Sequence, residues 1–269
     1  MTVPAAVQSG NVGGNQLALT GGEARGLTHD VGMQLDERAS GSLVSAVACR
    51  TPASSGRREK KLIAVSRVPP HVLDFGTTGK LRNSDLVMYD RQTESWWQQF
   101  TGEAIVGALT GAELRLVPAR LESFAQFKAR HPGGKVLVPN NPGLRDYGRN
   151  PYVGYDMAAA PFLYRGEYPK DVEAMARVVV VRPAPGKVGA VTLEHLRKKG
   201  HLALGDVELA WQPGQSTALD HWDIAQGRDV GSVIATMTGQ DGRPADVPYD
   251  VTFAFAVFAF HPEVVIVKD

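Results

Sequence analysis

Short apolar segments separated by turn residues make up most of the chain after about residue 70. Several are rich in β-branched or aromatic side chains, as in "DLVMYD", "ESWWQQF" and "ARVVVV". Segments of this length and composition, bounded by Gly, Pro, Asn or Asp, predict β-strands, and "ELRLVPARL" and "KVLVP" are predicted to be strands as well. "HVLDFGTTGKL" predicts a strand, a Gly-bounded turn and the start of the next strand. Because most of the links between them are as short as hairpin turns, we expect neighbouring strands to pair antiparallel.

The last strand expected is the apolar run "VTFAFAVFAF" at residues 251–260, together with the residues just before it. Strand alternation would place five apolar side chains on one face: Tyr249, Val251, Phe253, Phe255 and Val257. The run is far shorter than the roughly 20 residues that a membrane-spanning helix needs. We therefore interpret it as a core strand.

Two segments carry helix signals. "SFAQFKARHPGG" has Ser123 at an N-cap position and ends in Pro and Gly, and "TLEHLRKKG" has Thr192 as its N-cap and Gly200 after its basic last turn. These two helices and about ten short strands together indicate the fold class. The chain is predicted to be α+β and mainly β, with antiparallel short strands and hairpins and two short helices.

Residues 1–69 differ from the rest of the chain. They lack an aromatic residue and any apolar periodicity, and the stretch after Cys49 is rich in Arg and Lys. Such a segment buries too little apolar surface to offset its ordering entropy. We expect a boundary near Pro69 and Pro70, a poorly ordered segment at 1–69 in which Cys49 has no functional partner, and a single β-rich domain at 70–269.

Residues 81–107 read as two strands around a tight turn at "DRQT", followed by two of the four tryptophans of the chain. Asp90 is predicted to be structural, because a short Asx side chain can accept backbone N–H groups of its own turn. Trp96 and Trp97 are adjacent, so in a strand they point to opposite faces and should differ in burial. One can enter the core, and the other packs against a further layer or forms a ligand wall.

Two functions remain open from the residues alone. The first is a soluble, β-rich module that binds a small molecule or a protein, with its surface on the hairpin and on the tyrosine-rich loop at 140–170, because long loops are often functional. The second is a hydrolytic or redox enzyme at the same place, using Asp85, Asp90, Glu103 or Tyr89. The candidate ligand-binding residues are Lys80, Asn83, Asp85, Tyr89, Trp96, Trp97, Gln98, Glu103, Tyr152 and Tyr155.

Composition and motifs exclude several classes. The net charge of +1 gives no global attraction to nucleic acid or to an anionic membrane. The chain lacks a Gly-x-Ser-x-Gly elbow, a phosphate-binding loop, a dinucleotide fingerprint and a His-Glu-x-x-His motif, so no cofactor is expected. His221 and Asp223 could share a metal or a proton, but a turn at "DHWD" is the simpler interpretation. No secretory signal or membrane span is readable, and the compartment stays open.

The segment "DFGTTGKLRNSDLVMYDRQTESWWQQFTGEAIVGALTGAEL" resembles the core signature of the bacterial family called domain of unknown function 3179. The family pattern has a Gly-x-Leu turn, a "MYDR-x-T" hairpin, a Trp-x-Gln return and a Gly-x-Ala-x-x-Gly continuation. "PYVGYD", "GRDVGSV" and "DVPYDVTFAFAVFAF" fit as well, so the resemblance covers about residues 72–267. It implies no activity, because the family has none assigned.

One departure from the family pattern concerns the upstream segment. Members of the family usually carry a Cys-Pro-x-Cys pair there, which suggests metal binding or thiol chemistry. This chain has Cys49 alone, so the resemblance implies no thiol-pair chemistry here. We hypothesise that residues 1–69 are translated out of frame or from a wrong start, which a Cys-Pro-x-Cys in another frame of the coding DNA would support.

Overall fold

The computed structural model describes residues 17–18, 73–114, 116–136, 138, 141, 143, 146–161, 163–184 and 186–269. The expectations for the N-terminal segment 1–69 and for Cys49 therefore lie outside the described residues, except at Leu17–Ala18. These two residues form β1, which pairs antiparallel with β6 (Arg120–Leu121).

The first sheet is the predicted hairpin region, which we call the hairpin sheet. Its strands pair antiparallel in chain order: β2 (Phe75–Arg82), β3 (Asp85–Asp90), β4 (Trp96–Gln98) and β5 (Ala104–Val106). Asn83 and Ser84 have φ of 53° and 64°, as a two-residue hairpin turn requires. The predicted Gly turn inside "DFGTTGKL" is instead a bulge between Thr77 and Lys80 in one continuous strand.

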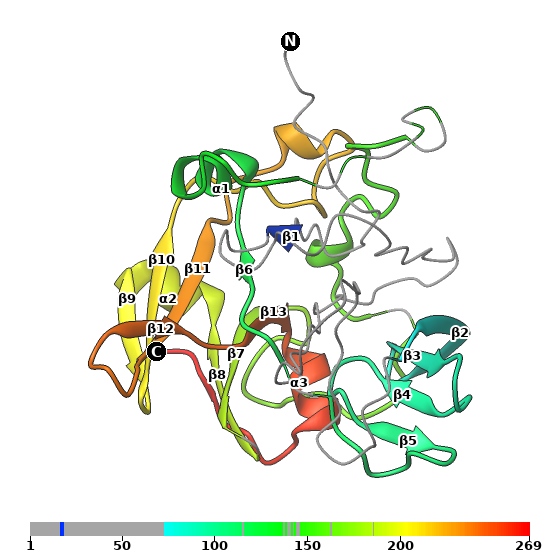
Figure 1. Cartoon of the computed structure of the whole chain (residues 1–269). Coiled ribbons are helices and arrows are strands. Elements are labelled where there is room, and N and C mark those ends of the chain that lie inside the picture. The colour runs from blue at the N-terminus through cyan, green and yellow to red at the C-terminus, as the bar shows by residue number, and fades with distance from the viewer. Residues whose placement is uncertain are drawn as a thin grey trace.

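The described residues form two further four-stranded sheets (Figure 1). One has the order β13-β7-β8-β14, in which only β14 runs parallel to its neighbour. The other has the order β12-β11-β10-β9 and is antiparallel throughout. The strands are β7 (Arg177–Ala184), β8 (Lys187–Thr192), β9 (His201–Leu204), β10 (Val207–Gln212), β11 (Ser232–Thr238), β12 (Pro244–Asp246), β13 (Tyr249–Phe253) and β14 (Ile266–Val267).

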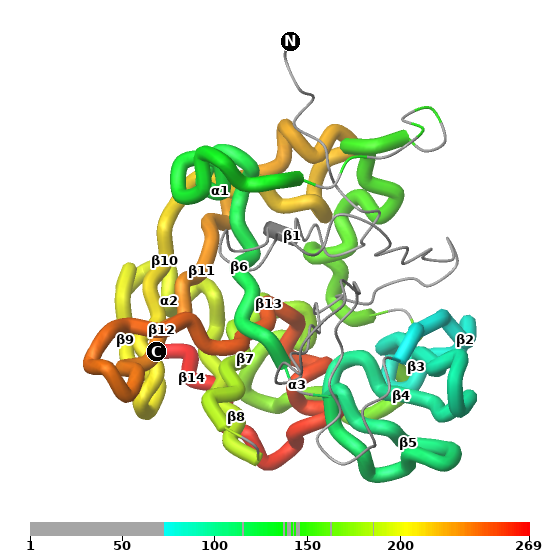
Figure 2. Tube along the Cα trace, viewed as in Figure 1, coloured from blue at the N-terminus to red at the C-terminus, as the bar shows by residue number. Residues whose placement is uncertain are grey.

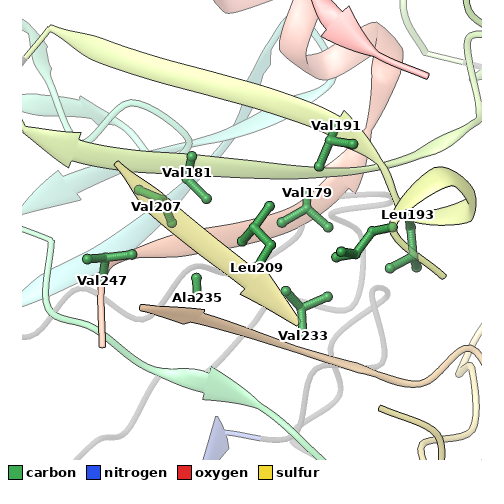
Figure 3. Close-up of a cluster of buried hydrophobic side chains, with 10 residues drawn as sticks. Val179, Val181, Val191, Leu193, Val207, Leu209, Val233, Ala235 and Val247 are labelled. Carbon is green, nitrogen blue, oxygen red and sulfur yellow. The ribbon is translucent and has the colours of Figure 1, made fainter. Parts of the chain in front are cut away.

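The valine run of β7 lies in the core on both faces. Val179 and Val181 lie beside Val191 of β8 and face Leu209 and the other buried apolar side chains of β10 and β11, as Figure 3 shows. Val178 and Val180 point to the opposite face, where they pack against α3 (Ala254–Phe260). A strand covered on both faces reads as a continuous apolar run, which is the pattern seen in the sequence.

Both predicted helices are present. α1 (Phe124–Arg130) begins at a capping box, in which Ser123 and Gln126 bond to each other's backbone N–H. α2 (Leu193–Lys199) begins at Thr192, whose hydroxyl accepts the N–H of His195, and ends at Gly200 with φ of 73°. The mainly β, antiparallel prediction is thus confirmed at the level of fold class.

A third helix, α3, corrects the prediction for the C-terminal apolar run. The strand β13 ends at Phe253, and the next seven residues form a helix instead of continuing the strand. Ala254 and Val257, one helical turn apart, cover the valines of β7. A short apolar run has no periodicity that distinguishes a buried helix from a buried strand, so tertiary packing decides.

Other strand boundaries are also shorter than predicted. In "ELRLVPARL" the only regular strand among the described residues is β6, and Lys135, Val136 and Val138 of "KVLVP" lie outside any strand. No helix in the described part of the chain has the length and apolar character needed to cross a bilayer.

Candidate functional site

Asp90 is held inside its own turn. Its carboxylate is fully buried and accepts the backbone N–H of Thr93 at 2.5 Å and the hydroxyl of Thr93 at 2.8 Å. It also accepts the indole N–H of Trp97 at 2.9 Å. The prediction that Asp90 is structural is confirmed, because every one of these partners belongs to the hairpin.

The two tryptophans differ in burial, as predicted. Trp97 is 0% exposed and packs edge-on against Phe75, with ring centroids 5.6 Å apart. Trp96 is half-buried, and the ammonium group of Lys80 lies 5.7 Å from its ring centroid. Trp97 therefore belongs to the core of the hairpin sheet, while Trp96 and Lys80 form part of its outer face.

The tyrosines of the long loop lie elsewhere. Tyr155 is buried and packs on Phe253 with ring centroids 5.7 Å apart, and Tyr152 joins the same cluster. Burial raises the pKa of the Tyr155 phenol to about 12, and the neighbouring Tyr152 adds to this effect. These residues form a core cluster on β13, so the structure does not bring them into the hairpin sheet.

The remaining predicted site residues of the hairpin sheet differ in how exposed their side chains are. The hydroxyl of Tyr89 accepts a guanidinium N–H of Arg91 at 2.7 Å, and Glu103 is exposed. Asp85 is buried, and its carboxylate accepts the side-chain amide of Gln98 and, at 3.0 Å, the backbone N–H of Phe100. Among the predicted site residues, Asn83, Asp85 and Gln98 lie on the side of the hairpin sheet that meets α3.

We call this contact between the hairpin sheet and α3 the seam; Figure 1 shows the two elements side by side. Asn83 donates its amide to the carbonyl of Ala259 at 3.1 Å. Aromatic and guanidinium groups then stack in layers: Arg82 lies over Phe260 at 5.7 Å, Phe260 stacks on Phe100 at 5.2 Å, and Arg182 lies over Phe100 at 4.7 Å. The seam thus joins three segments that are far apart in sequence.

Charges at the seam are paired. Arg182, from β7, forms an ion pair with Asp250 of β13, and both side chains are largely buried. The same guanidinium lies 3.4 Å from the carbonyl oxygen of Phe100. Arg182 and Asp250 therefore neutralise each other at the seam.

His261 closes the seam at the end of α3. Its ring lies 5.9 Å from the ring of Phe100. Burial lowers the pKa of His261, the positive charge of Arg182 lowers it further, and the carboxylate of Glu263 opposes both effects without overcoming them. The imidazole is therefore neutral at pH 7, and its Nε2 atom has no hydrogen-bond partner.

Unpartnered buried polar atoms concentrate at the seam. Nine such side-chain atoms occur in the described part of the chain. Three belong to seam residues, Gln98 Oε1, Arg182 Nε and His261 Nε2, and two belong to Gln99, the residue between Gln98 and Phe100 in the chain, Oε1 and Nε2. Gln99 is only 2% exposed, yet neither end of its amide is bonded. Native proteins pair nearly all buried polar groups, so these unpartnered atoms distinguish this region within the described part of the chain.

Sequence reasoning found part of this set. It named Asn83, Asp85 and Gln98 but missed Gln99, Arg182 and His261. The sequence held one signal for Gln99. Gln98 and Gln99 follow Trp97 directly, and two adjacent glutamines cannot both reach solvent if the strand is covered. The others are brought in by long-range packing, which local patterns do not reveal.

His221 and Asp223 form a turn. The ring Nδ1 of His221 accepts the N–H of Asp223 at 3.0 Å, and Asp223 caps the short 3₁₀ helix at Ile224–Gln226. Asp223 also pairs with Arg149 at 3.1 Å. The described residues hold no group of three or more His, Cys, Asp or Glu side chains that could hold a metal ion.

Comparison with known families gives one match. The family described as "Protein of unknown function (DUF3179)" matches residues 60–264, which include the whole hairpin sheet and the seam. The match starts ten residues before the boundary expected at residue 70. No curated protein and no solved structure matches the chain significantly.

Proposed function

This chain belongs to the family of proteins of unknown function DUF3179, and from that premise we propose that it is a binding module whose seam takes a small, uncharged polar ligand. The observation that carries the proposal is Gln99. Its side chain is almost fully buried, and neither amide atom has a partner.

The energetic argument is direct. A buried donor or acceptor left unpaired costs about 1–3 kcal/mol. Gln99 alone presents one of each, and Gln98 Oε1 and Arg182 Nε add one acceptor and one donor. A molecule that supplies both donors and acceptors would recover much of this cost, so the site favours a bound polar group.

The charge balance selects the kind of group. Arg182 is neutralised by Asp250, and burial beside Arg182 keeps His261 neutral. A charged ligand would lose its hydration without gaining a free counter-ion. A carboxamide or a urea-like group carries no charge and has the mixed donors and acceptors that Gln99 can bind.

Binding is favoured over catalysis by the carboxylates of the hairpin. Asp90 is occupied by Thr93 and Trp97, and Asp85 by Gln98 and Phe100. A general acid or base has to reach the proton that it transfers. These two side chains are instead directed to donors of their own sheet, which is what a binding module would show.

The test uses the side-chain amide resonance of Gln99 in an NMR titration with acetamide. We expect acetamide to shift this resonance and other seam resonances, and to leave the seam resonances of Gln99→Leu, a change of similar size, unshifted. Gln240→Leu, in an exposed turn, is the matched control and should leave the other seam resonances responsive. A Gln99 amide that contacts only long-lived water and does not respond to acetamide would contradict the proposal.

A further inference from the structure

The outer face of the hairpin sheet carries a row of aromatic and apolar side chains. Strand pairing aligns Gly76, Tyr89, Trp96 and Val106 at one level across all four strands. Side chains that stand opposite each other in paired strands share a face, and the core side chains, such as Trp97, occupy the other face. We call Tyr89, Trp96 and Val106 the platform.

The platform lies away from the seam. Strand β3 runs from Asp85, at the seam, to Tyr89, in the platform, a separation of about 13 Å for four residues of a strand. Figure 2 shows β2 to β5 on the opposite side of the molecule from β9 and β10. A ligand on the platform would therefore contact the hairpin sheet and not the main core.

The side chains of the platform are open to solvent. Tyr89 and Trp96 are half-buried, and Val106 is 52% exposed. The ring of Tyr89 lies against the backbone of Gly76, since a Cβ atom at Gly76 would come within 2.6 Å of it. The ring thus rests on β2 instead of standing away from the sheet, which keeps this face flat.

Lys80 supplies an uncompensated positive charge beside Trp96. Its side chain is exposed, and its ammonium group lies 5.7 Å from the centroid of the Trp96 ring. That ammonium group forms no ion pair or hydrogen bond with a described residue. Arg91 lies 5.5 Å from the ring of Tyr89, but it is paired with Asp74 at 3.5 Å. An anion at the platform would therefore be attracted chiefly to Lys80.

Trp96 also offers a hydrogen-bond donor. The indole N–H groups of Trp97 and Trp211 are each bonded to a protein oxygen at 2.9 Å. The indole N–H of Trp96 has no such partner within the described part of the chain, and it is not a buried atom. A tryptophan placed in this way presents an apolar ring and a free donor to the same ligand.

We propose that the platform is a carbohydrate-binding surface, separate from the seam, and that it takes sugar rings that carry a carboxylate, as in a uronic-acid polysaccharide. A pyranose ring has a face of C–H groups that packs on an aromatic side chain, and hydroxyl groups that can accept the indole N–H. Its carboxylate complements Lys80. Because neighbouring strands lie about 4.8 Å apart, Tyr89 and Trp96 can contact successive rings of one chain.

The charge of the platform favours a uronic acid over a nucleic acid. A nucleic-acid strand is held by several cations along its phosphates. The platform has one uncompensated cation, Lys80, beside one aromatic ring, that of Trp96. A single carboxylate on a sugar ring matches this arrangement.

The experiment is an NMR titration of the full chain with trigalacturonic acid at pH 7, followed through the indole Nε1–H resonance of Trp96. We expect the trisaccharide to shift this resonance and to bind Lys80→Gln about threefold more weakly, as the loss of an exposed ion pair implies. Its methyl ester, which has the same rings without the charges, should bind both proteins equally. Lys128→Gln, at an exposed position of α1, is the matched control and should keep the affinity of the unmodified protein.

A second variant tests the aromatic contact. Trp96→Leu should abolish the response of the backbone amide of Val106 to trigalacturonic acid. Trp222→Leu removes another tryptophan that is 53% exposed, and it should leave that response unchanged. If Trp96→Leu does not fold, Lys80→Gln decides, because it changes only an exposed side chain.

Four results would overturn the proposal: a Trp96 resonance that does not move with trigalacturonic acid, equal affinity of Lys80→Gln and the unmodified protein for it, equal affinity of the acid and its methyl ester, or tighter binding of oligothymidylate. The seam proposal is read from Gln99 with acetamide, so the two proposals can fail independently.

Discussion

At the scale of single residues, the hairpin shows how one carboxylate can organise a turn and a core ring together. Asp90 joins the turn at Thr93 to the indole of Trp97. The bond between Asp90 and its own turn could be predicted from "DRQT", because Asx side chains form hydrogen bonds to nearby backbone groups. The bond to Trp97 could not, since it depends on the register of β3 against β4.

Asp90→Ala should destabilise the protein, because it leaves the buried indole N–H of Trp97 and the N–H of Thr93 without acceptors. We expect a loss of about 1–3 kcal/mol in the free energy of unfolding, measured by chemical denaturation. Asp241→Ala, which removes a single bond in an exposed turn, is the control and should cost less. Equal costs for the two variants would contradict this account of Asp90.

His261 should make stability depend on pH near neutrality. Its pKa in the folded protein lies below the ordinary value of 6.5 because of burial and Arg182. The folded state therefore disfavours the protonated ring, and this contribution is fully present above pH 6.5 and is lost as the pH falls below it. Arg182, Asp250 and Glu263 are the other charged groups around this end of the seam.

The check is the unfolding midpoint between pH 7.5 and pH 5.5. We expect the unmodified protein to lose stability over this interval and His261→Asn to lose less. His201→Asn, at an exposed position beside Glu208, should follow the unmodified protein. Parallel curves for His261→Asn and the unmodified protein would show that the ring is not titrating as described.

At the scale of elements, the sheets were easier to predict than the last helix. Hairpin-length links and β-branched runs identified the antiparallel strands and the buried β7. The run after Phe253 carries the same apolar residue types, but in the structure it turns into α3 because Ala254 and Val257 then cover Val178 and Val180. That choice depends on a partner surface, which the run itself does not contain.

Tyr249→Phe should weaken the join between β6 and β11. Its hydroxyl bonds Leu121 and Val233, and burial raises the pKa of the phenol, so the group is neutral and donates to one strand while accepting from the other. Removing it should cost about 1–3 kcal/mol in denaturation experiments. Tyr89→Phe, which removes an exposed hydroxyl, should have little effect; a similar cost would argue against a special role for Tyr249.

Asp229 should stabilise the loops before β11 in a pH-dependent way. Burial raises the pKa of its carboxyl group, but the hydrogen bonds from the backbone N–H groups of Gly214, Gln215 and Gly231 outweigh this and lower the pKa below the usual 3.8. The stabilisation is therefore present above about pH 3.8 and disappears as the pH falls through the lowered value. Asp229→Asn should show a shallower loss of stability in acid; an identical acid profile would contradict this role.

At the scale of the whole molecule, the seam is a product of long-range packing. The seam combines residues 82–85 and 98–100 with Arg182, Asp250 and His261. Sequence patterns gave the hairpin residues Asn83, Asp85 and Gln98 because they lie in one local motif. They did not give the partners, whose sequence separation of 80 residues or more leaves no local pattern.

The central claim is that the seam holds a polar, uncharged ligand at Gln99, and a crystal structure of the protein soaked in acetamide tests it most directly. The account predicts a planar amide at the seam, bonded to the side chain of Gln99 and lying beside Phe100. A structure in which the Gln99 amide is bonded to other protein groups, or in which only water occupies the seam at saturating acetamide, would contradict it.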